Sequence, residues 1–117
     1  FVAKVIDFLD RSQSKYDTAL LYVSDHGESL GDNGLYLHGM PYAIAPDVQK
    51  QVPFLVWLSA GFRASFGIDQ GCLRSHANEA VSHDNLFHSL LGVLDVQTTD
   101  YRRSMDIFAP CRPPPPA

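Results

Sequence analysis

The residues best suited to chemistry in this chain form the segment Ser24-Asp25-His26-Gly27-Glu28. This segment follows an apolar run typical of a β-strand, and α/β proteins bind ligands beyond the carboxyl ends of their strands. Adjacent strand side chains point to opposite faces, so Asp25 and His26 converge only if the chain leaves strand geometry. Gly27, which lacks a Cβ, permits that bend. Carboxylate oxygen and imidazole nitrogen suit catalytic zinc, so Asp25 and His26 are candidate zinc ligands.

Two more side chains of the same region are candidates for this centre. Glu28 and His38 lie within residues 25–39, a fifteen-residue stretch with four glycines. We expect this stretch to form one long loop, and long loops in compact domains tend to be functional. Glu28 and His38 are therefore candidate metal ligands or substrate contacts. Simpler interpretations stay open, because an Asp-His pair can be a cap or a surface pair, Glu28 can be solvated, and His38 can be a hydrogen-bonding residue.

Hydrophobic patterning predicts the elements that position this region. Apolar residues recur at helical spacing in residues 1–11 and 84–95, which predicts two helices. Ser82 is the expected N-cap of the second helix. Unbroken apolar runs predict strands at residues 18–24 and 52–59, each covered on both faces as in a parallel sheet.

The remaining segments complete an α/β pattern. Residues 45–51 are expected to hold a short helix, and residues 61–80 are expected to be irregular. The order of helix, strand, long loop, strand and helix favours a layered α/β fold with a mainly parallel central sheet.

Composition limits the function classes. The 117 residues suffice for one small domain, and the net charge of −4 with a pI near 5.6 argues against nucleic acid as a partner. The net negative charge of the chain repels anions, so an anionic ligand would need a local positive charge such as a metal ion. The chain begins inside a predicted helix, so we expect it to be the C-terminal part of a longer protein.

The sixteen residues from 24 to 39, Ser-Asp-His-Gly-Glu-Ser-Leu-Gly-Asp-Asn-Gly-Leu-Tyr-Leu-His-Gly, resemble the signature of the lipid A phosphoethanolamine transferases. That family includes the mobile colistin-resistance enzymes and belongs to the alkaline phosphatase and sulfatase superfamily. The similarity continues through Pro41, Val52-Pro53 and the segment 82–88 to residues 105–107. The Asp-His-Gly triplet alone would indicate only the superfamily. Asp32 stands where many relatives have Glu, which is a conservative difference.

The resemblance implies a sulfatase-like layered fold and a place in the cell. It implies a multi-pass anchor in the bacterial inner membrane, followed by a zinc domain at the periplasmic face. Residues 1–112 would be the C-terminal portion of that catalytic domain, and residues 113–117 a proline-rich tail. A role in polymyxin resistance through lipopolysaccharide modification is implied as well.

The resemblance also implies a reaction, which is zinc-dependent transfer of phosphoethanolamine from phosphatidylethanolamine to lipid A through a covalent threonine. By motif, Asp25 and His26 are two zinc ligands, and His38 contacts phosphoethanolamine or a second zinc. Glu28 is placed near the site without a fixed role. The nucleophile is expected upstream, outside this chain. Thr18 agrees with this, because it precedes Asp25 by seven residues of strand, or roughly 23 Å.

Two rival functions remain open. One is a hydrolase of the same superfamily, either a sulfatase or a phosphodiesterase, which would share Asp25-His26-Gly27 but has no reason to share the loop through His38. The other is a zinc-binding module without catalytic activity.

Histidines and cysteines outside the loop have more ordinary interpretations. His83 and His88 flank the start of the last predicted helix, where we expect capping and packing rather than a second metal site. Cys72 and Cys111 lie 39 positions apart. They can form a disulfide, pair with other cysteines, or stay reduced, and the sequence does not choose among these states.

Overall fold

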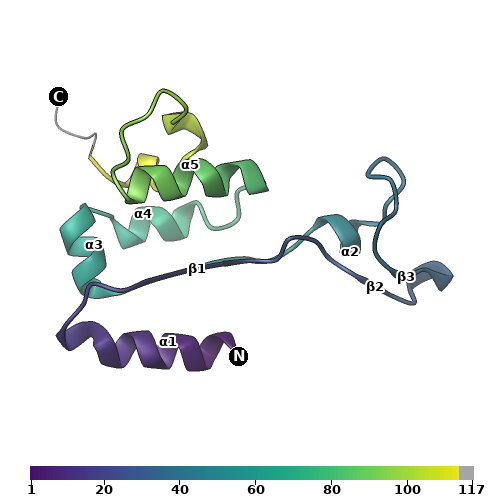
Figure 1. Ribbon diagram of the computed structural model, residues 1–117, viewed down its shortest axis with the longest axis horizontal. Coiled ribbons are helices and arrows are strands. Elements are labelled where there is room, and N and C mark those ends of the chain that lie inside the picture. Colours follow the sequence, from purple (N-terminus) through teal and green to yellow (C-terminus); the bar gives the residue numbers. More distant parts are fainter. Residues whose placement is uncertain (114–117) are drawn as a thin grey trace. The chain divides into compact units, whose positions relative to one another are not determined.

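The computed structural model describes residues 1–113, which fall into two compact units (Figure 1). The first unit combines Phe1–Thr18 with the chain from Leu58 onward, and the second unit is Ala19–Trp57. Apart from Pro113, the predicted proline tail lies outside the described residues. None of the helices in the described chain has the length and apolar character needed to cross a membrane.

The first and last predicted helices are both present in the first unit. Helix α1 spans Val2–Arg11 and helix α5 spans His83–Val93. Ser82 caps α5 as predicted, because its hydroxyl accepts a hydrogen bond from the Asp84 amide at 3.3 Å. Its own amide donates to Asn85 Oδ1 at 2.8 Å, which completes a capping box.

The prediction that residues 61–80 are irregular is wrong. This stretch forms helix α3 (Ala60–Phe66) and helix α4 (Gln70–Ser75). Each helix has an N-cap side chain: Ser59 Oγ accepts from the Phe62 amide at 3.1 Å, and Asp69 Oδ1 accepts from the Cys72 amide at 2.5 Å. Both helices are too short for a clear apolar period, which explains why patterning missed them.

A buried ion pair lies at the C-terminal end of the first unit. Asp106 is 2% exposed, and its Oδ2 lies 2.6 Å from Arg112 Nη2. The Tyr101 hydroxyl donates to the same oxygen at 2.7 Å, and the Phe108 amide donates to Oδ1 at 2.8 Å. Phe108 itself is fully buried. This network therefore fixes the chain that follows α5.

The second unit contains more regular structure than the predicted long loop. Strands β2 (Ser29–Leu30) and β3 (Tyr36–Leu37) form an antiparallel pair in which Ser29 faces Leu37. The 3-10 turn Asp32–Gly34 joins them. Gly31 and Gly34 have positive φ angles of 118° and 76°, so glycine is favoured where the chain reverses. The expectation of one long loop is therefore wrong.

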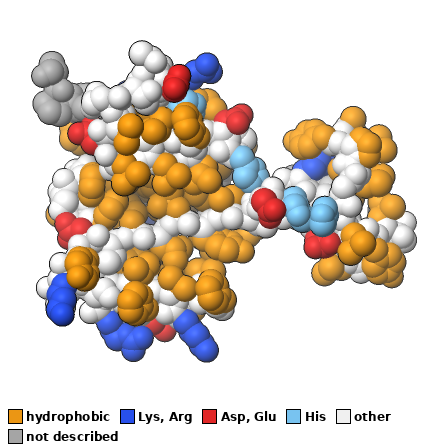
Figure 2. Space-filling view, viewed as in Figure 1, with side chains coloured by type: hydrophobic (Ala, Val, Ile, Leu, Met, Phe, Trp, Pro, Cys, Tyr) orange, Lys and Arg blue, Asp and Glu red, His pale blue; other side chains and the backbone are white. Residues whose placement is uncertain are grey.

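The two longer strands are present near their predicted bounds. Strand β1 (Ala19–Val23) pairs with β4 (Phe54–Leu58), and the short helix α2 (Asp47–Lys50) precedes β4. Within this chain the strands are not covered on both faces, because Tyr22 is 38% exposed and Leu55 is 45% exposed. The mainly parallel character of the sheet stays a prediction. Hydrophobic side chains are also visible over much of the surface (Figure 2).

Candidate functional site

Two histidines from the predicted loop region meet in the second unit. His26 follows strand β1 and His38 follows strand β3, and their ring centroids lie 3.9 Å apart with the planes tilted by 34°. In the space-filling view, histidine and acidic side chains gather on this unit (Figure 2). The β2–β3 hairpin brings the second histidine back to the end of β1.

Each of these histidines faces a carboxylate. His26 Nε2 lies 3.7 Å from Asp25 Oδ2, and His38 Nδ1 lies 3.3 Å from Glu28 Oε1. The second pair follows from the hairpin register, because Ser29 pairs with Leu37 and so Glu28 and His38 are the next residues along the two strands. All four predicted site residues therefore lie in one cluster.

The cluster is open to solvent. The side chains of His26 and Glu28 are 41% and 43% exposed, while those of His38 and Asp25 are 50% and 89% exposed. Hydrogen bonds from backbone amides, followed by the nearby His26 ring, lower the pKa of Asp25 below its usual value of 3.8. The Asp25 carboxylate is therefore anionic at neutral pH and available as a ligand.

Hydrogen bonding selects the tautomer of His26. Its Nδ1 lies 2.8 Å from the Gly27 carbonyl oxygen, which can only accept, so Nδ1 carries the proton. The lone pair is then on Nε2, the nitrogen nearer to Asp25. Two ligands of a tetrahedral zinc, at about 2.0–2.2 Å from the ion, lie about 3.4 Å apart. The Asp25–His26 separation of 3.7 Å is close to that value, so this pair fits two positions of a zinc site.

The role predicted for Gly27 needs a correction. Gly27 is not among the glycines with positive φ, so the bend does not depend on unusual dihedral angles. The lack of a Cβ matters instead for close approach: a Cβ there would lie 1.9 Å from the Val48 carbonyl oxygen. The Gly27 amide also donates to the Gln49 carbonyl oxygen at 3.1 Å. Glycine thus lets the segment with the candidate ligands Asp25 and His26 pack directly on the backbone of α2.

Gln49 supports the cluster, and sequence reasoning missed it. Its side chain is 8% exposed, and Nε2 donates to Ser29 Oγ at 2.8 Å and to the Leu37 carbonyl oxygen at 3.1 Å. Gln49 therefore joins α2 to both strands of the hairpin that carries Glu28 and His38. No sequence signal singled it out, because a lone glutamine in a short polar helix is ordinary surface composition.

The other candidates lie in the first unit. His88 Nδ1 accepts a hydrogen bond from the Arg102 amide at 3.1 Å, which agrees with the predicted packing role. His83 is the first residue of α5. Thr18 is buried, and its hydroxyl donates to the Leu9 carbonyl oxygen at 3.2 Å. Cys72 and Cys111 form a disulfide, which settles the three states left open by the sequence.

Comparison with known proteins identifies the class. The sulfatase family model matches residues 1–96, so the chain belongs to the sulfatase family. The resemblance to phosphoethanolamine transferases is confirmed as well. Phosphoethanolamine transferase EptA of Salmonella typhimurium is 53% identical over 112 residues, which are 95% of this chain and 20% of that protein. Phosphatidylethanolamine transferase Mcr-2 of Escherichia coli is 44% identical over 97 residues, which are 82% of this chain and 16% of that protein.

A solved structure agrees with this assignment. The integral membrane protein lipooligosaccharide phosphoethanolamine transferase A (EptA) from Neisseria meningitidis matches with a TM-score of 0.89 and 47% identity. The match covers 97% of this chain and 21% of that chain. The predicted sulfatase-like α/β fold is thus confirmed. The chain spans about one fifth of the length of the curated relatives it matches.

Proposed function

We propose that this chain is part of a zinc-dependent transferase that moves phosphoethanolamine from phosphatidylethanolamine to lipid A. The reaction would pass through a covalent threonine intermediate whose nucleophile lies outside this chain. The observation that carries the proposal is the pairing of the Asp25 carboxylate with the Nε2 lone pair of His26 at 3.7 Å, beside the His38 ring. The names of the relatives support the chemistry, since each of them is a phosphoethanolamine or phosphatidylethanolamine transferase.

The location follows from the same proposal. The enzyme would act at the periplasmic face of the bacterial inner membrane, held there by a part of the protein other than this chain. A relative that is an integral membrane protein supports this location. The partners would be two lipids rather than nucleic acid, in keeping with the net charge of −4.

Asp25 and His26 would hold the zinc ion. When bound, zinc supplies a Lewis acid that neutralises phosphate oxygens and lowers the pKa of a coordinated hydroxyl. The lowered pKa of Asp25 keeps a negative charge at the site over the physiological pH range. The Gly27 carbonyl holds the His26 ring with Nε2 free for the ion. The two residues supply two ligands, and the resemblance implies that the others lie outside this chain.

His38 and Glu28 would serve the substrate or a second zinc. Glu28 Oε1 lies 3.3 Å from His38 Nδ1, so the carboxylate can fix the orientation of the ring. This leaves His38 Nε2 to contact the phosphoethanolamine group or a metal. Because these residues are 43% and 50% exposed, a headgroup can reach them from solvent.

The experiment compares metal content and lipid transfer in variants of the intact protein. Asp25→Ala and His26→Ala are expected to abolish zinc retention and transfer, because each removes a ligand. His38→Ala is expected to impair transfer with less loss of zinc. His83→Ala, at the start of α5, serves as the matched histidine control and is expected to keep both properties.

The outcomes also separate the rival functions. Wild-type zinc content and transfer in the Asp25→Ala and His26→Ala variants would refute the ligand assignment. Release of free phosphoethanolamine without modified lipid A would identify a hydrolase of the same superfamily. Zinc binding without turnover in the intact protein would identify a non-catalytic module.

A further inference from the structure

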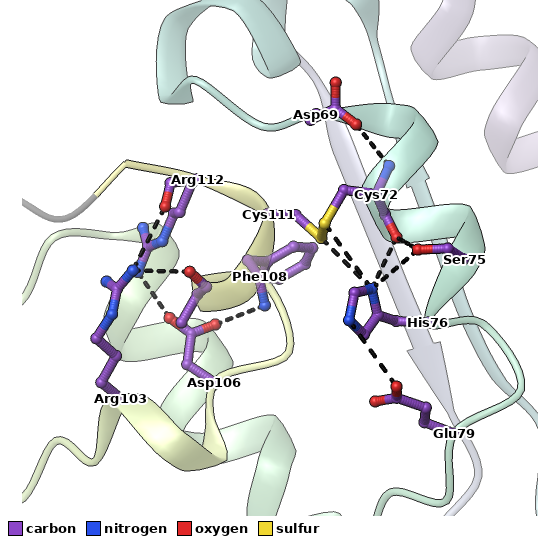
Figure 3. Close-up of a disulfide and its surroundings, with 11 residues drawn as sticks. Asp69, Cys72, Ser75, His76, Glu79, Arg103, Asp106, Phe108, Cys111 and Arg112 are labelled. Carbon is purple, nitrogen blue, oxygen red and sulfur yellow. Dashed lines mark hydrogen bonds and ion pairs between the residues drawn. A yellow bond between two sulfur atoms is a disulfide. The ribbon is translucent and has the colours of Figure 1, made fainter.

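A histidine faces both sulfur atoms of the Cys72–Cys111 disulfide in the first unit (Figure 3). His76 Nδ1 lies 3.8 Å from Cys72 Sγ and 3.8 Å from Cys111 Sγ. The other ring nitrogen, Nε2, lies 3.8 Å from Glu79 Oε1. One imidazole thus stands between two sulfur atoms and a carboxylate, and the proposed transfer reaction gives this group no role.

We propose that this group is a latent zinc site that becomes available when the disulfide is reduced. The ligands would be Cys72, His76 and Cys111. Two thiolates and one imidazole form a donor set that zinc proteins use, with a fourth position open to water. The three ligand atoms already lie within 4.8 Å of one another. Within residues 1–113, Cys72, His76 and Cys111 are the set of three potential ligands whose donor atoms lie this close together.

The observed separations are near those of a bound zinc. With Zn–S bonds of about 2.3 Å and Zn–N bonds of about 2.0–2.1 Å, tetrahedral geometry places sulfur and nitrogen about 3.6 Å apart. Both Sγ–Nδ1 distances are 3.8 Å. The two sulfur atoms must separate from about 2.0 Å to about 3.8 Å, so each moves by about 0.9 Å. A small side-chain rotation suffices for such a movement.

Contacts other than the sulfur–sulfur bond hold the two cysteines in place. The Asp69 amide donates to the Cys111 carbonyl oxygen at 2.8 Å, and Asp69 Oδ1 caps α4 through the Cys72 amide at 2.5 Å. The Cys111 amide donates to the carbonyl oxygen of the fully buried Phe108 at 3.0 Å. None of these bonds involves a sulfur atom, so we expect them to persist in the reduced chain and to keep the two thiols close together.

His76 is oriented for this role from both sides. Cys72 and His76 are four residues apart along α4 and its C-terminal cap, a spacing that places their side chains on one face. In the oxidised state Nδ1 carries a proton, which it donates to the Cys72 carbonyl oxygen at 2.8 Å. Zinc at Nδ1 would replace this hydrogen bond, with the imidazole proton exchanged through solvent to Nε2, which faces Glu79. Zinc-bound histidines commonly donate this second N–H to a carboxylate.

A dithiol can reduce the Cys72–Cys111 disulfide in a balanced reaction. Two electrons and two protons from the reductant break the Sγ–Sγ bond and form two thiols, while the reductant becomes a disulfide. Zinc binding then releases one proton from each thiol to solvent, so the affinity rises with pH.

The test is a titration of the reduced intact protein with Co²⁺, a spectroscopic substitute for zinc, and Cys72→Ser serves as the reference that lacks the site. A thiolate-to-cobalt charge-transfer band that is lost in Cys72→Ser reports this site, because Cys72 and Cys111 are the two cysteines of the 117 residues. We expect the band to saturate at one ion per reduced chain, to disappear when Zn²⁺ is added, and to be missing from the oxidised chain. A reduced chain without the band would overturn the proposal.

Variants separate a built site from chance binding by two thiols. His76→Ala is expected to weaken Co²⁺ and Zn²⁺ binding by more than about tenfold, and Glu79→Gln by about tenfold. His83→Ala is the control and should bind as the wild type does. Protection of Cys72 and Cys111 from alkylation by Zn²⁺ gives a second measurement that does not depend on the absorption band. Wild-type affinity and protection in His76→Ala would rule out the site. This inference is independent of the proposed transferase function.

Discussion

Replacing Gly27 by alanine tests how the segment with the candidate ligands Asp25 and His26 is held against α2. The added Cβ would lie 1.9 Å from the Val48 carbonyl oxygen and 3.2 Å from Gln49 Cα. Both are backbone atoms, so they cannot rotate away as a side chain would. An ordinary contact needs about 3.4 Å, so the segment and α2 must separate by about 1.5 Å. That separation breaks the hydrogen bond from the Gly27 amide to the Gln49 carbonyl oxygen.

The loss of stability has two sources, the steric clash and the broken hydrogen bond. Forcing an extra carbon into a packed position costs about 1–3 kcal/mol, and a lost hydrogen bond costs about 1 kcal/mol. We therefore expect local opening of the second unit to become easier by about 2–4 kcal/mol. Amides of residues 24–30 and 47–51 should exchange hydrogen about 30-fold to about 1,000-fold faster. Because Asp25 and His26 precede Gly27, zinc affinity of the intact protein should fall as well.

Gly34→Ala is the matched control in the same unit. A Cβ at Gly34 meets no atom within 4 Å, but the φ angle of 76° carries a strain cost of about 1 kcal/mol. Amide hydrogen exchange around Gly34 should therefore become faster by no more than about tenfold, and the zinc affinity of the intact protein should stay unchanged. If Gly27→Ala matched the wild type in both exchange and zinc affinity, the close approach to α2 would not support the site.

Three predictions concern the first unit. Ser82→Ala should cost about 1 kcal/mol by removing the capping box, seen as faster amide exchange in the first turn of α5. Arg112→Met should cost about 3 kcal/mol in urea unfolding of the oxidised chain, because Asp106 would stay buried without its partner, and an unchanged transition would contradict this. Burial, followed by the hydrogen bond to Asp106, raises the pKa of Tyr101 above 10.0 in the folded protein. The contribution of Tyr101 to the free energy of unfolding is therefore present below pH 10 and is lost as the pH rises through the pKa of the folded state. Unfolding free energy should thus fall above pH 10, and Tyr101→Phe should lack that part of the fall.

The elements that the sequence predicted are those with a strong local signal. The last predicted helix has five apolar residues at helical spacing and Ser82 before it, so its start was predicted within one residue. Helices α3 and α4 were missed although Ser59 and Asp69 cap them, because a single cap residue without an apolar period is also common in turns. The β2–β3 hairpin was missed because two-residue strands are too short to show alternation.

In the candidate site too, the sequence predicts contacts between neighbouring residues better than contacts between distant ones. Neighbouring positions and residue types were enough to select Asp25 and His26, and the structure places the two side chains 3.7 Å apart. The pairing of Glu28 with His38 depends on the register of the hairpin, which sets residues ten positions apart beside each other. Once that register is known, the contact follows from strand geometry. Glu28 and His38 therefore flank a small sheet that Gln49 holds to α2, and this predicts that Gln49→Ala will disturb His38 more than Asp25.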